Sequence, residues 1–416
     1  MTSASPSHDL VSTVRQVVQS AQKLASLGTE TKSHALELMA QALENNQDQI
    51  LEANTLDLEA SREMAVPDLV LDWLRLTPER LQVATKILRR LSALGTPSPQ
   101  MSRLPYAHDA ATAYYQLQPL GVIALVYEAF PELGAIAAGL CCRVGNGLVL
   151  KGGSEASQTN QIIVQVLQEA IALAGLPETS LLFLSPEQGD ALRNQLVQLP
   201  NINLVIPYGR PSLIQQIKRQ ATVPVLASTM GNCYLYWSAS SSSDLVYEMI
   251  TESHRGEPDA VNAIEKVLVH TSHAGSMLTR LWQRLREQGF DLQGDEALVA
   301  EFPELSLADS QDWQQPYLGP KIAFKRVESL RAAIAWINRY SSGHADCLVT
   351  ESYAEGRQFA LNVSSTSVYI NASSRFSRNP KQGTSIALGM SSQEGRSGGI
   401  IGLEALTTIK QIVQGN

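Results

Sequence analysis

The sequence predicts an α/β protein with two doubly wound, parallel-sheet domains, and two observations carry that prediction. From Gly121 to Ala227, short apolar runs of β type alternate with helical segments, and a second alternating set runs from Cys233 to Phe376. Parallel neighbours in a sheet need a crossover connection, so strands and helices must alternate along the chain. The 416 residues, 44% of them hydrophobic, suffice for about two to three domains with packed cores.

The first hundred residues are predicted to be helical. In DLVSTVRQVVQSAQKLASLG (9–28) apolar residues recur at three- and four-residue steps until Gly28 closes the run, and residues 29–53 repeat the pattern. The segment HDAATAYYQLQP (108–119) instead has β-type alternation before a proline, which predicts an exposed hairpin strand.

The first alternating set has two predicted helices, over residues 158–174 and 212–220. Its predicted strands are GVIALVY (121–127), GLVLK (147–151), SLLFL (180–184), NLVIP (203–207) and VPVLA (223–227). Ligands of such sheets bind at the carboxyl ends of the strands.

The second set predicts another α/β domain, with helices over residues 275–288 and 327–338. Its predicted strands are KVLVH (266–270), KIAFK (321–325), CLVTE (347–351) and SVYIN (367–371). After Arg375 the chain becomes rich in glycine and serine and ends with the short segment LTTIKQIVQ (406–414).

Composition excludes several classes of partner. The net charge is −8 and no run of lysine or arginine forms a basic patch, so neither nucleic acid nor an anionic membrane is an expected partner. The N-terminal residues do not resemble a secretory signal, and no apolar stretch reaches the 18 or so residues of a membrane helix. A cytoplasmic location is therefore expected. The four cysteines lack C-x-x-C spacing and are interpreted as buried free thiols, and no metal site is expected.

The segment LVLKGGSEA (148–156) places Lys151 and a pair of glycines at the end of a predicted strand. There, backbone N–H groups and an ammonium can contact a phosphate or a ribose. The alternative interpretation is a turn that the sheet itself requires. The chain has no G-x-G-x-x-G motif.

Three further segments carry a family resemblance. They are EPDAVNAIEKVLVH (257–270), PLGVIALVYEAFPELGAIAAGLCCRVGNGLVLKGGSEA (119–156) and NASSRF (371–376). With others in the same order, they resemble the γ-glutamyl phosphate reductase family of the aldehyde dehydrogenase superfamily over about residues 8–412. In the family's R-P-S-x-C-N-x-x-E pattern, Pro258, Asn262 and Glu265 match, and Val261 stands at the position of the nucleophilic cysteine.

The resemblance implies an aldehyde dehydrogenase-like domain plan. Residues 1–107 and 119–232 would form the cofactor-binding domain, and residues 233–376 the catalytic-type domain. Residues 108–118 and 398–416 would be oligomerisation elements, with 377–397 a loop returning to the cofactor domain. The implied reaction is NADPH-dependent reduction of L-glutamate 5-phosphate to L-glutamate 5-semialdehyde and phosphate, a step of proline biosynthesis.

The resemblance also implies site residues. Lys151, Gly152, Ser154 and Glu155 would bind the adenosine half of NADPH. Asn371 and Arg375 would bind the substrate, with Arg375 receiving a carboxylate, and the alternative is that this arginine ties a loop to the sheet. His344 is interpreted as a loop histidine with satisfied hydrogen bonds rather than an acid or base.

Departures from the family pattern lie in the segments used for chemistry. Val261 cannot attack a carbonyl, so no catalytic residue is predicted to be intact. Glu132 is expected to repel an acyl phosphate, and Lys381 stands where a glutamate would grip the nicotinamide ribose, so NADPH binding is expected to be weakened. The other departures are Phe130, Ala227, Ser228, Tyr234, Ala387, Arg396 and Gly398.

Two hypotheses remain open for the function. One is a working reductase with an unrecognised nucleophile. The other is a non-catalytic paralogue that binds a ligand related to glutamyl phosphate, or a partner protein. In either case the expected assembly is a homo-oligomer or a mixed oligomer with an active homologue.

Overall fold

The computed structural model of the chain describes residues 6–95, 111–186, 189–256, 259–381, 385–392 and 398–415. The chain forms two compact units. Unit 1 consists of Met1–Ala227, Arg378–Leu388 and Ile401–Asn416, and unit 2 consists of Ser228–Ser377 and Gly389–Ile400. The first boundary therefore lies at 227/228, where 232/233 was expected. The segment 377–397, which was expected to return to the first domain, is divided between the two units. The cofactor, catalytic and oligomerisation roles of these parts stay predictions.

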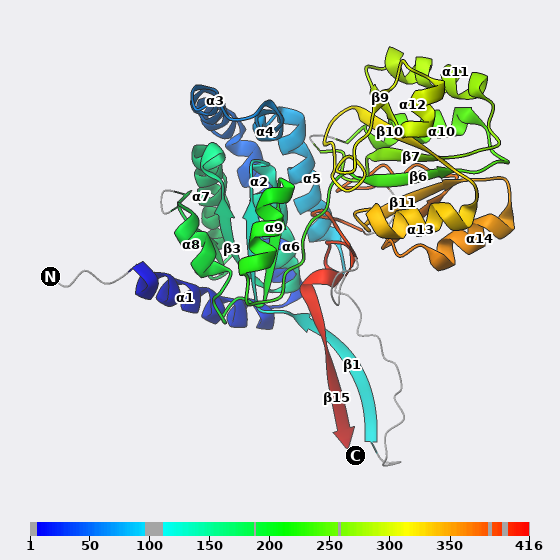
Figure 1. Cartoon of the computed structure of the whole chain (residues 1–416). Coiled ribbons are helices and arrows are strands. Elements are labelled where there is room, and N and C mark those ends of the chain that lie inside the picture. Colours follow the sequence, from blue (N-terminus) through cyan, green and yellow to red (C-terminus); the bar gives the residue numbers. More distant parts are fainter. Residues whose placement is uncertain are drawn as a thin grey trace. The chain divides into compact units, whose positions relative to one another are not determined.

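Unit 1 begins with helices, as expected (Figure 1). Its helices are α1 (Pro6–Ser26), α2 (Thr29–Asn45), α3 (Gln47–Glu63), α4 (Asp68–Leu74), α5 (Pro78–Ala93), α6 (Glu132–Val144), α7 (Ser157–Leu173), α8 (Gly189–Leu196) and α9 (Pro211–Gln220), with the short 3-10 turns η1 (Ser154–Ala156), η2 (Glu178–Ser180) and η4 (Glu404–Leu406).

The single helix predicted over residues 29–53 is wrong, because the chain forms α2 and α3 with a break at Asn46. That residue has φ −107° and ψ 16°, and its side-chain amide donates to the carbonyl of Ala42. An asparagine that bonds nearby backbone competes with helix continuation.

The sheet of unit 1 has four parallel strands in the order β4-β3-β2-β5. The strands are β2 (Val122–Tyr127), β3 (Gly147–Gly152), β4 (Leu181–Phe183) and β5 (Leu204–Tyr208). The strand predicted over residues 223–227 does not form, and Val225 makes only an isolated bridge to Val205. Pro224, the residue before Val225, has no N–H with which to extend this bridge into a ladder.

Helices cover both faces of this sheet. Residues of α1, α8 and α9 pack on the face that carries Val122, Ala124 and Val126. Helix α6 packs on the opposite face, where Gly134 lies against Tyr127 and Leu150. The carboxyl ends of β2, β3 and β5 are the edge at which a ligand of a doubly wound sheet binds.

A two-stranded antiparallel ribbon also belongs to unit 1 (Figure 1). Strand β1 (Ala111–Pro119) pairs with β15 (Thr407–Gly415) from the end of the chain, in a register that joins Pro119 to Thr407. Leu117, Ile409 and Val413 expose apolar side chains on it.

Unit 2 contains a seven-stranded parallel sheet in the order β12-β11-β6-β7-β10-β8-β9. The strands are β6 (Cys233–Trp237), β7 (Ile264–His270), β8 (Asp291–Gly294), β9 (Ser306–Leu307), β10 (Lys321–Val327), β11 (Ala345–Val349) and β12 (Ser367–Ile370), and β13 (Met390–Ser391) pairs with β14 (Gly399–Ile400). The helices are α10 (Ser243–Ser253), α11 (Gly275–Glu287), α12 (Glu296–Glu301), α13 (Leu330–Tyr340) and α14 (Tyr353–Asn362).

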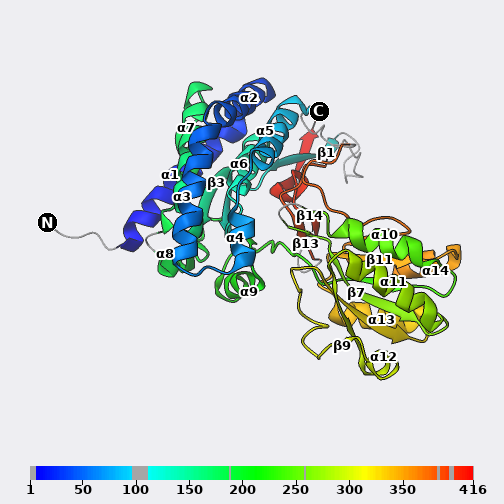
Figure 2. The same cartoon turned by 90° about the horizontal axis from the view of Figure 1, so that it is seen from above.

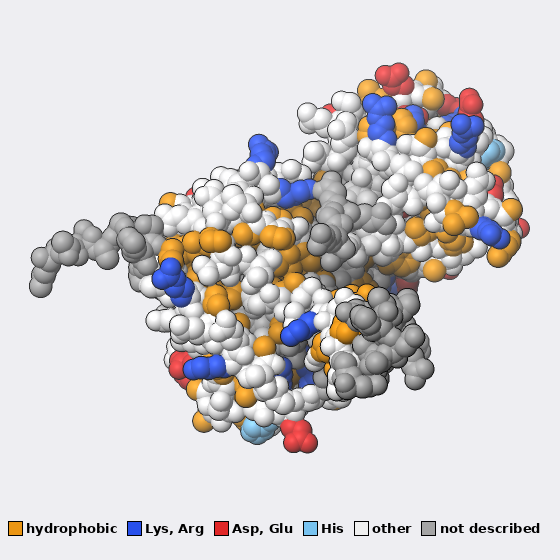
Figure 3. Space-filling view, turned by 90° about the horizontal axis from the view of Figure 1, so that it is seen from below, with side chains coloured by type: hydrophobic (Ala, Val, Ile, Leu, Met, Phe, Trp, Pro, Cys, Tyr) orange, Lys and Arg blue, Asp and Glu red, His pale blue; other side chains and the backbone are white. Residues whose placement is uncertain are grey.

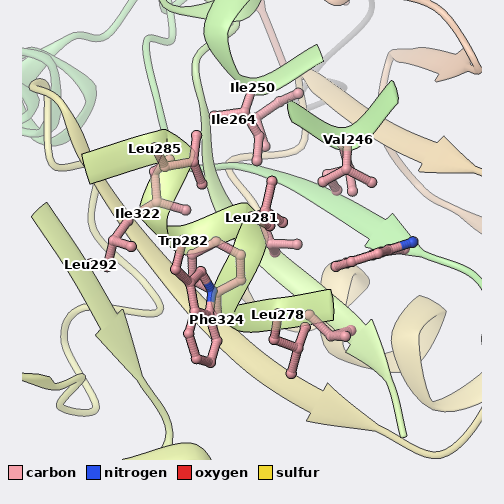
Figure 4. Close-up of a cluster of buried hydrophobic side chains, with 14 of the residues drawn as sticks. Val246, Ile250, Ile264, Leu278, Leu281, Trp282, Leu285, Leu292, Ile322 and Phe324 are labelled. Carbon is pink, nitrogen blue, oxygen red and sulfur yellow. The ribbon is translucent and has the colours of Figure 1, made fainter. Parts of the chain in front are cut away.

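The sheet of unit 2 is also covered on both faces, with α10 and α11 on one side and α13 and α14 on the other (Figure 1), and Figure 2 shows α10 and α11 over the strands. Leu235 and Trp237 of β6 point into a core shared with α10 and α11, of which Figure 4 shows Trp282 beside Phe324. Tyr234 and Tyr236 point the other way, toward α13. Alternate side chains of one strand thus enter two cores, as the period of two requires.

The predicted α/β class with parallel sheets is confirmed. On the face shown in Figure 3, lysine and arginine side chains stand apart from one another. None of the helices in the described ranges has the length and apolar character needed to cross a membrane.

Candidate active-site segment and nucleotide edge

The segment that contains Val261 precedes strand β7, at the amino-terminal edge of the unit 2 sheet. The Val261 side chain is 0% exposed, and its carbonyl accepts hydrogen bonds from Gly231 N at 3.0 Å and from His344 Nε2 at 2.9 Å. An isopropyl group has no lone pair to attack a carbonyl, so this position offers no nucleophile. Pro258 lies outside the described residues.

Asn262 connects this segment to the NASSRF loop. Its amide donates to Ser374 O at 2.8 Å and to the Tyr369 hydroxyl at 3.2 Å, and the Ser374 hydroxyl donates to Asn262 O at 3.0 Å. The backbone of Arg375 therefore lies one residue from the partner of Asn262, and the Arg375 side chain is exposed. The structure thus brings Asn262 and the loop of Arg375 together.

The side chain of Asn371 is engaged by the backbone of Thr350. Asn371 follows β12 with φ +51°, and its side chain bonds both peptide groups of Thr350, accepting from the N–H at 2.9 Å and donating to the carbonyl at 2.6 Å. This places its amide at the carboxyl-terminal edge of the sheet, whereas Val261 precedes the amino-terminal edge. The substrate roles of Asn371 and Arg375 stay predictions.

His344 has the contacts of a satisfied buried histidine. Its Nε2 faces the Val261 carbonyl, which can only accept, so Nε2 carries the proton, and Nδ1 lies 2.9 Å from the Ser342 hydroxyl. Burial lowers the pKa of His344 to about 4, so the ring is neutral near pH 7.

Cys233 is the thiol that lies near this histidine, with Sγ 3.4 Å from His344 Nε2. Since Nε2 already carries a proton, it cannot accept the thiol proton. Burial raises the pKa of Cys233 well above its ordinary value, and burial also raises the pKa of Cys141, Cys142 and Cys347. All four thiols are buried, as predicted, and none has the environment of an activated nucleophile.

Glu265 organises the loops around the segment. Its carboxylate accepts from the peptide N–H groups of Asn232, Tyr317 and Leu318 at 2.8 to 2.9 Å. Asn232 and Leu318 both have positive φ, at +54° and +55°. Such backbone persists only where surrounding groups hold it, so Glu265 has a structural role here.

Lys151 and Glu155 lie at the carboxyl edge of β3. Lys151 is only 6% exposed, and its Nζ donates to Gly152 O at 3.4 Å. Burial lowers its pKa. Glu155 accepts from Ala129 N at 2.5 Å, and a Cβ at Gly153 would lie 2.2 Å from both of its carboxylate oxygens. Ser154 is exposed on this edge. Residue 153 must therefore be a glycine for the Glu155 carboxylate to lie where it accepts from Ala129 N.

The expectation that Glu132 repels an acyl phosphate is wrong, because its charge is neutralised. Glu132 is buried and its carboxylate is held by Arg80 through Nε at 3.1 Å and Nη2 at 2.6 Å. Arg80 also donates to the carbonyls of Trp73 and Arg75. The arginine lies 52 residues upstream, and nothing in the local sequence indicated the pair.

Phe130 lies in the turn between β2 and α6, two residues before Glu132. It has φ +45° after Ala129 at φ +53°, it stacks on Trp73 with centroids 4.8 Å apart, and it meets the Tyr208 ring edge-on at 5.3 Å. Two consecutive residues of this backbone type are costly and are held by surrounding packing. Tyr208 in turn accepts from Arg378 Nη2 at 2.6 Å, which ties residues 378–388 to unit 1.

A further ion pair, missed in the sequence, lies at the ends of β2 and β5. Arg210 donates to Glu128 through its backbone N–H and its Nε, each at 2.9 Å, and through Nη2 at 2.5 Å. Arg210 precedes α9, and its side chain is 41% exposed.

The remaining departures have ordinary surroundings. Tyr234 is buried and donates to Trp313 O at 2.6 Å, Ala387 is buried and Lys381 is exposed, whereas Arg396 lies outside the described residues. Within the described ranges, His, Cys, Asp and Glu side chains form no group of three or more suited to a metal ion.

The amino-acid sequence matches the aldehyde dehydrogenase family over residues 2–296 and 306–412. The chain belongs to this family. A relative from Synechocystis sp., γ-glutamyl phosphate reductase 2, is 49% identical over 393 residues and covers 94% of each chain. The γ-glutamyl phosphate reductase of Gloeobacter violaceus is 37% identical, covering 97% of this chain and 96% of its own.

Solved structures agree with this membership. The crystal structure of γ-glutamyl phosphate reductase from Thermotoga maritima has a TM-score of 0.88 at 30% identity and covers 98% of both chains. A glyceraldehyde-3-phosphate dehydrogenase from Methanocaldococcus jannaschii, complexed with NADP, has a TM-score of 0.71 at 13% identity over 99% of this chain and 95% of its own, and shows the fold alone. The aldehyde dehydrogenase-like fold predicted from the sequence is confirmed.

Proposed function

We propose that this chain is a γ-glutamyl phosphate reductase-type protein that has kept a nucleotide-binding edge and lost the covalent step. The reaction implied by the resemblance to γ-glutamyl phosphate reductase is the reduction of L-glutamate 5-phosphate to L-glutamate 5-semialdehyde with release of phosphate. In a thiol mechanism, a thiolate attacks the acyl phosphate carbon, phosphate leaves, and the thioester is reduced by hydride, which NADPH supplies when bound.

The observation that carries the proposal is Val261 at the nucleophile position. A buried isopropyl group cannot form the thioester. Substitution by another thiol is disfavoured, because all four cysteines are buried and Cys233 faces a histidine nitrogen that already carries a proton. The protein would then act by binding a ligand related to glutamyl phosphate, or by joining a homo-oligomer or a mixed oligomer with an active homologue.

Nucleotide binding is the part of the function that unit 1 supports. Lys151 is a buried cation at the carboxyl edge of β3, and the glycine pair that follows makes room for the side chains of Asn160 and Glu155. Lys151, Gly152, Ser154 and Glu155 are the residues proposed to hold the adenosine half of NADPH. Lys381 in place of a ribose-gripping glutamate is the reason to expect a loosely held nicotinamide half.

The test compares the wild-type protein with Val261→Cys and Val261→Ala in the phosphate-dependent oxidation of glutamate 5-semialdehyde by NADP. Wild type and Val261→Ala are expected to stay at background. Val261→Cys should form a covalent acyl adduct, detectable by mass spectrometry, with turnover below that of an intact reductase because Phe130 and Lys381 remain. Wild-type turnover of about 1 to 10³ per second would refute the proposal.

A working reductase is the second candidate, and the identity of 49% to a protein named as a reductase favours it. It requires a nucleophile other than a cysteine at 261. The same assay separates the two candidates, because this one predicts full wild-type turnover that Val261→Ala leaves unchanged.

A further inference from the structure

An extra residue interrupts the pairing of β6 with β7, next to the segment that contains Val261. The partner of Cys233 on β7 is Ile264, and the partner of the next β6 residue is Lys266. Glu265 is thus the extra residue of a β-bulge. Bulges are enriched next to active sites, where they re-aim a side chain.

The packing of β7 agrees with a bulge at this point. Ile264 and Val267 enter the same core although they are three residues apart. A regular strand, with its period of two, would point them to opposite faces. The extra residue, Glu265, therefore takes a direction that an uninterrupted strand would not give it.

The carboxylate of Glu265 faces the loop that precedes β6. Its Oε2 accepts from Asn232 N at 2.9 Å, and a Cβ on Gly231 would lie 2.6 Å from its Oε1. Gly231 and Asn232 have φ +66° and +54°, and a non-glycine residue keeps such a backbone only where surrounding groups hold it. The N–H of Gly231 in turn donates to Val261 O at 3.0 Å. Glu265 is therefore connected to residue 261 through two adjacent residues of positive φ.

A second loop meets the same carboxylate. Tyr317 N donates to Oε2 at 2.8 Å, and Leu318 N donates to Oε1 at 2.9 Å. Lys266 also holds this loop, because its Nζ lies 3.4 Å from Gln315 O and 3.4 Å from the centre of the Tyr317 ring. The same ammonium lies 3.3 Å from Glu265 Oε2, so the buried negative charge is paired and hydrogen-bonded.

The contacts on residue 261 involve its main chain. Its carbonyl accepts from Gly231 N and, at 2.9 Å, from His344 Nε2. The Ser342 hydroxyl, two residues before that histidine, lies 3.0 Å from Gly231 O and joins the two loops. None of these hydrogen bonds uses the Val261 side chain, so the framework does not depend on which side chain residue 261 carries.

We propose that Glu265 is a positioning residue for position 261: through Asn232 and Gly231 it holds the main chain so that a thiol there can attack the acyl carbon of the ligand. This inference rests on the proposed function, in which the covalent step was lost with the thiol. The framework that aims residue 261 was kept. Its effect on rate is large, since a misplacement of about 1 Å can cost about 100-fold.

The experiment starts from Val261→Cys and adds Glu265→Gln or Glu265→Ala. Each protein is mixed with L-glutamate 5-semialdehyde and NADP in the absence of phosphate. The thiol adds to the aldehyde, hydride leaves to NADP, and the resulting thioester is followed over time by mass spectrometry of the peptide that contains position 261.

The two Glu265 variants should have graded effects. Glu265→Gln keeps one oxygen for Asn232 N and Tyr317 N, and should lower the maximal rate of thioester formation about 10-fold. Glu265→Ala keeps no acceptor and should lower that rate about 100-fold. The aldehyde concentration that gives half the maximal rate should stay the same, because Glu265 is not proposed to contact the ligand.

Two controls separate positioning from a general loss of structure. Asp295→Ala, at the carboxyl edge of β8, removes a carboxylate that caps α12 and accepts from Lys325 Nζ at 3.1 Å. Added to Val261→Cys, it should lower the melting temperature and leave the rate of thioester formation unchanged. Alkylation of the introduced thiol by iodoacetamide needs no bound ligand, so its rate should not fall in the Glu265 variants.

The outcomes distinguish this inference from the proposed function. Equal rates of thioester formation with and without the Glu265 substitutions would overturn the inference and leave the proposed function standing, as would an equal loss of rate in Asp295→Ala. If Val261→Cys alone forms no thioester, the covalent step expected under the proposed function fails, and the inference fails with it. If Glu265→Ala does not fold, Glu265→Gln decides.

Discussion

The buried pair of Arg80 and Glu132 gives the sharpest stability prediction for unit 1. Its side chains are 7% and 5% exposed, and two guanidinium nitrogens contact the carboxylate. Removing one member of such a pair leaves an uncompensated buried charge, which costs about 3–5 kcal/mol. Arg80→Met also frees the carbonyls of Trp73 and Arg75, so it should be the more damaging single substitution.

A double-mutant cycle isolates the pair. Arg80→Met and Glu132→Leu are measured singly and together by urea unfolding at pH 7, followed by circular dichroism, and hydrogen exchange locates the loss in α5 and α6. The double variant should recover about 2 kcal/mol or more of the summed losses, because neither charge is then left alone.

The matched control is the pair Arg89–Glu44, which has the same 2.6 Å separation between Nη2 and a carboxylate oxygen but is 42% exposed on both sides. Its cycle should give a coupling below about 1 kcal/mol. Equal couplings for the two pairs would refute the reasoning that burial gives the Arg80–Glu132 contact its value, and with it the explanation of how Glu132 is tolerated.

Three more predictions concern single groups. Burial raises the pKa of Asp346 to about 7, although Tyr234 N and the hydroxyls of Ser341 and Ser365 donate to it. The folded state then holds this proton more tightly than the unfolded chain. The free energy of unfolding should therefore decrease as the pH rises from about 4 to about 7. Asp346→Asn should flatten that dependence in pH-resolved melting curves, and an unchanged slope would contradict the assignment. Gly153→Ala should displace the Glu155 carboxylate, 2.2 Å from the new Cβ, and weaken NADPH binding by calorimetry, whereas Gly28→Ala, a surface change with open space and an ordinary φ of −65°, should not. The native protein should leave all four thiols unlabelled by a disulfide reagent at pH 8 and expose four on denaturation. Rapid labelling of one thiol in the native state would revive a substitute nucleophile.

Local patterns predicted the strands well where they were fully buried. Strand β2 is a continuous apolar segment, and β3, β7 and β10 each contain three consecutive apolar residues, LVL, VLV and IAF, from which their type follows. The prediction at residues 223–227 failed because Pro224 offers no N–H, and the break at Asn46 was hidden inside a continuing helical period. Helix α8 was missed because it is short.

Site residues were harder to predict, since their roles depend on partners far along the chain. The sequence indicated Val261 and Lys151 by position, but Arg80 beside Glu132 and the bulge at Glu265 appear only once the chain is folded. A charge in a sequence does not reveal whether a distant residue neutralises it. For that reason the repulsion predicted for Glu132 was wrong while the burial of the cysteines was right.

The order of segments along the chain has a consequence for biosynthesis. Unit 2 is contiguous in most of its length, from Ser228 to Ser377, so its parallel sheet is available to fold while the ribosome is still at work. Unit 1 is not complete until Leu406 and β15 are made, because β15 pairs with β1 and Leu406 O accepts from Leu120 N and from the Asn146 amide. A polypeptide that stopped before Thr407 would therefore carry all of unit 2, and a unit 1 in which β1 lacks its partner strand.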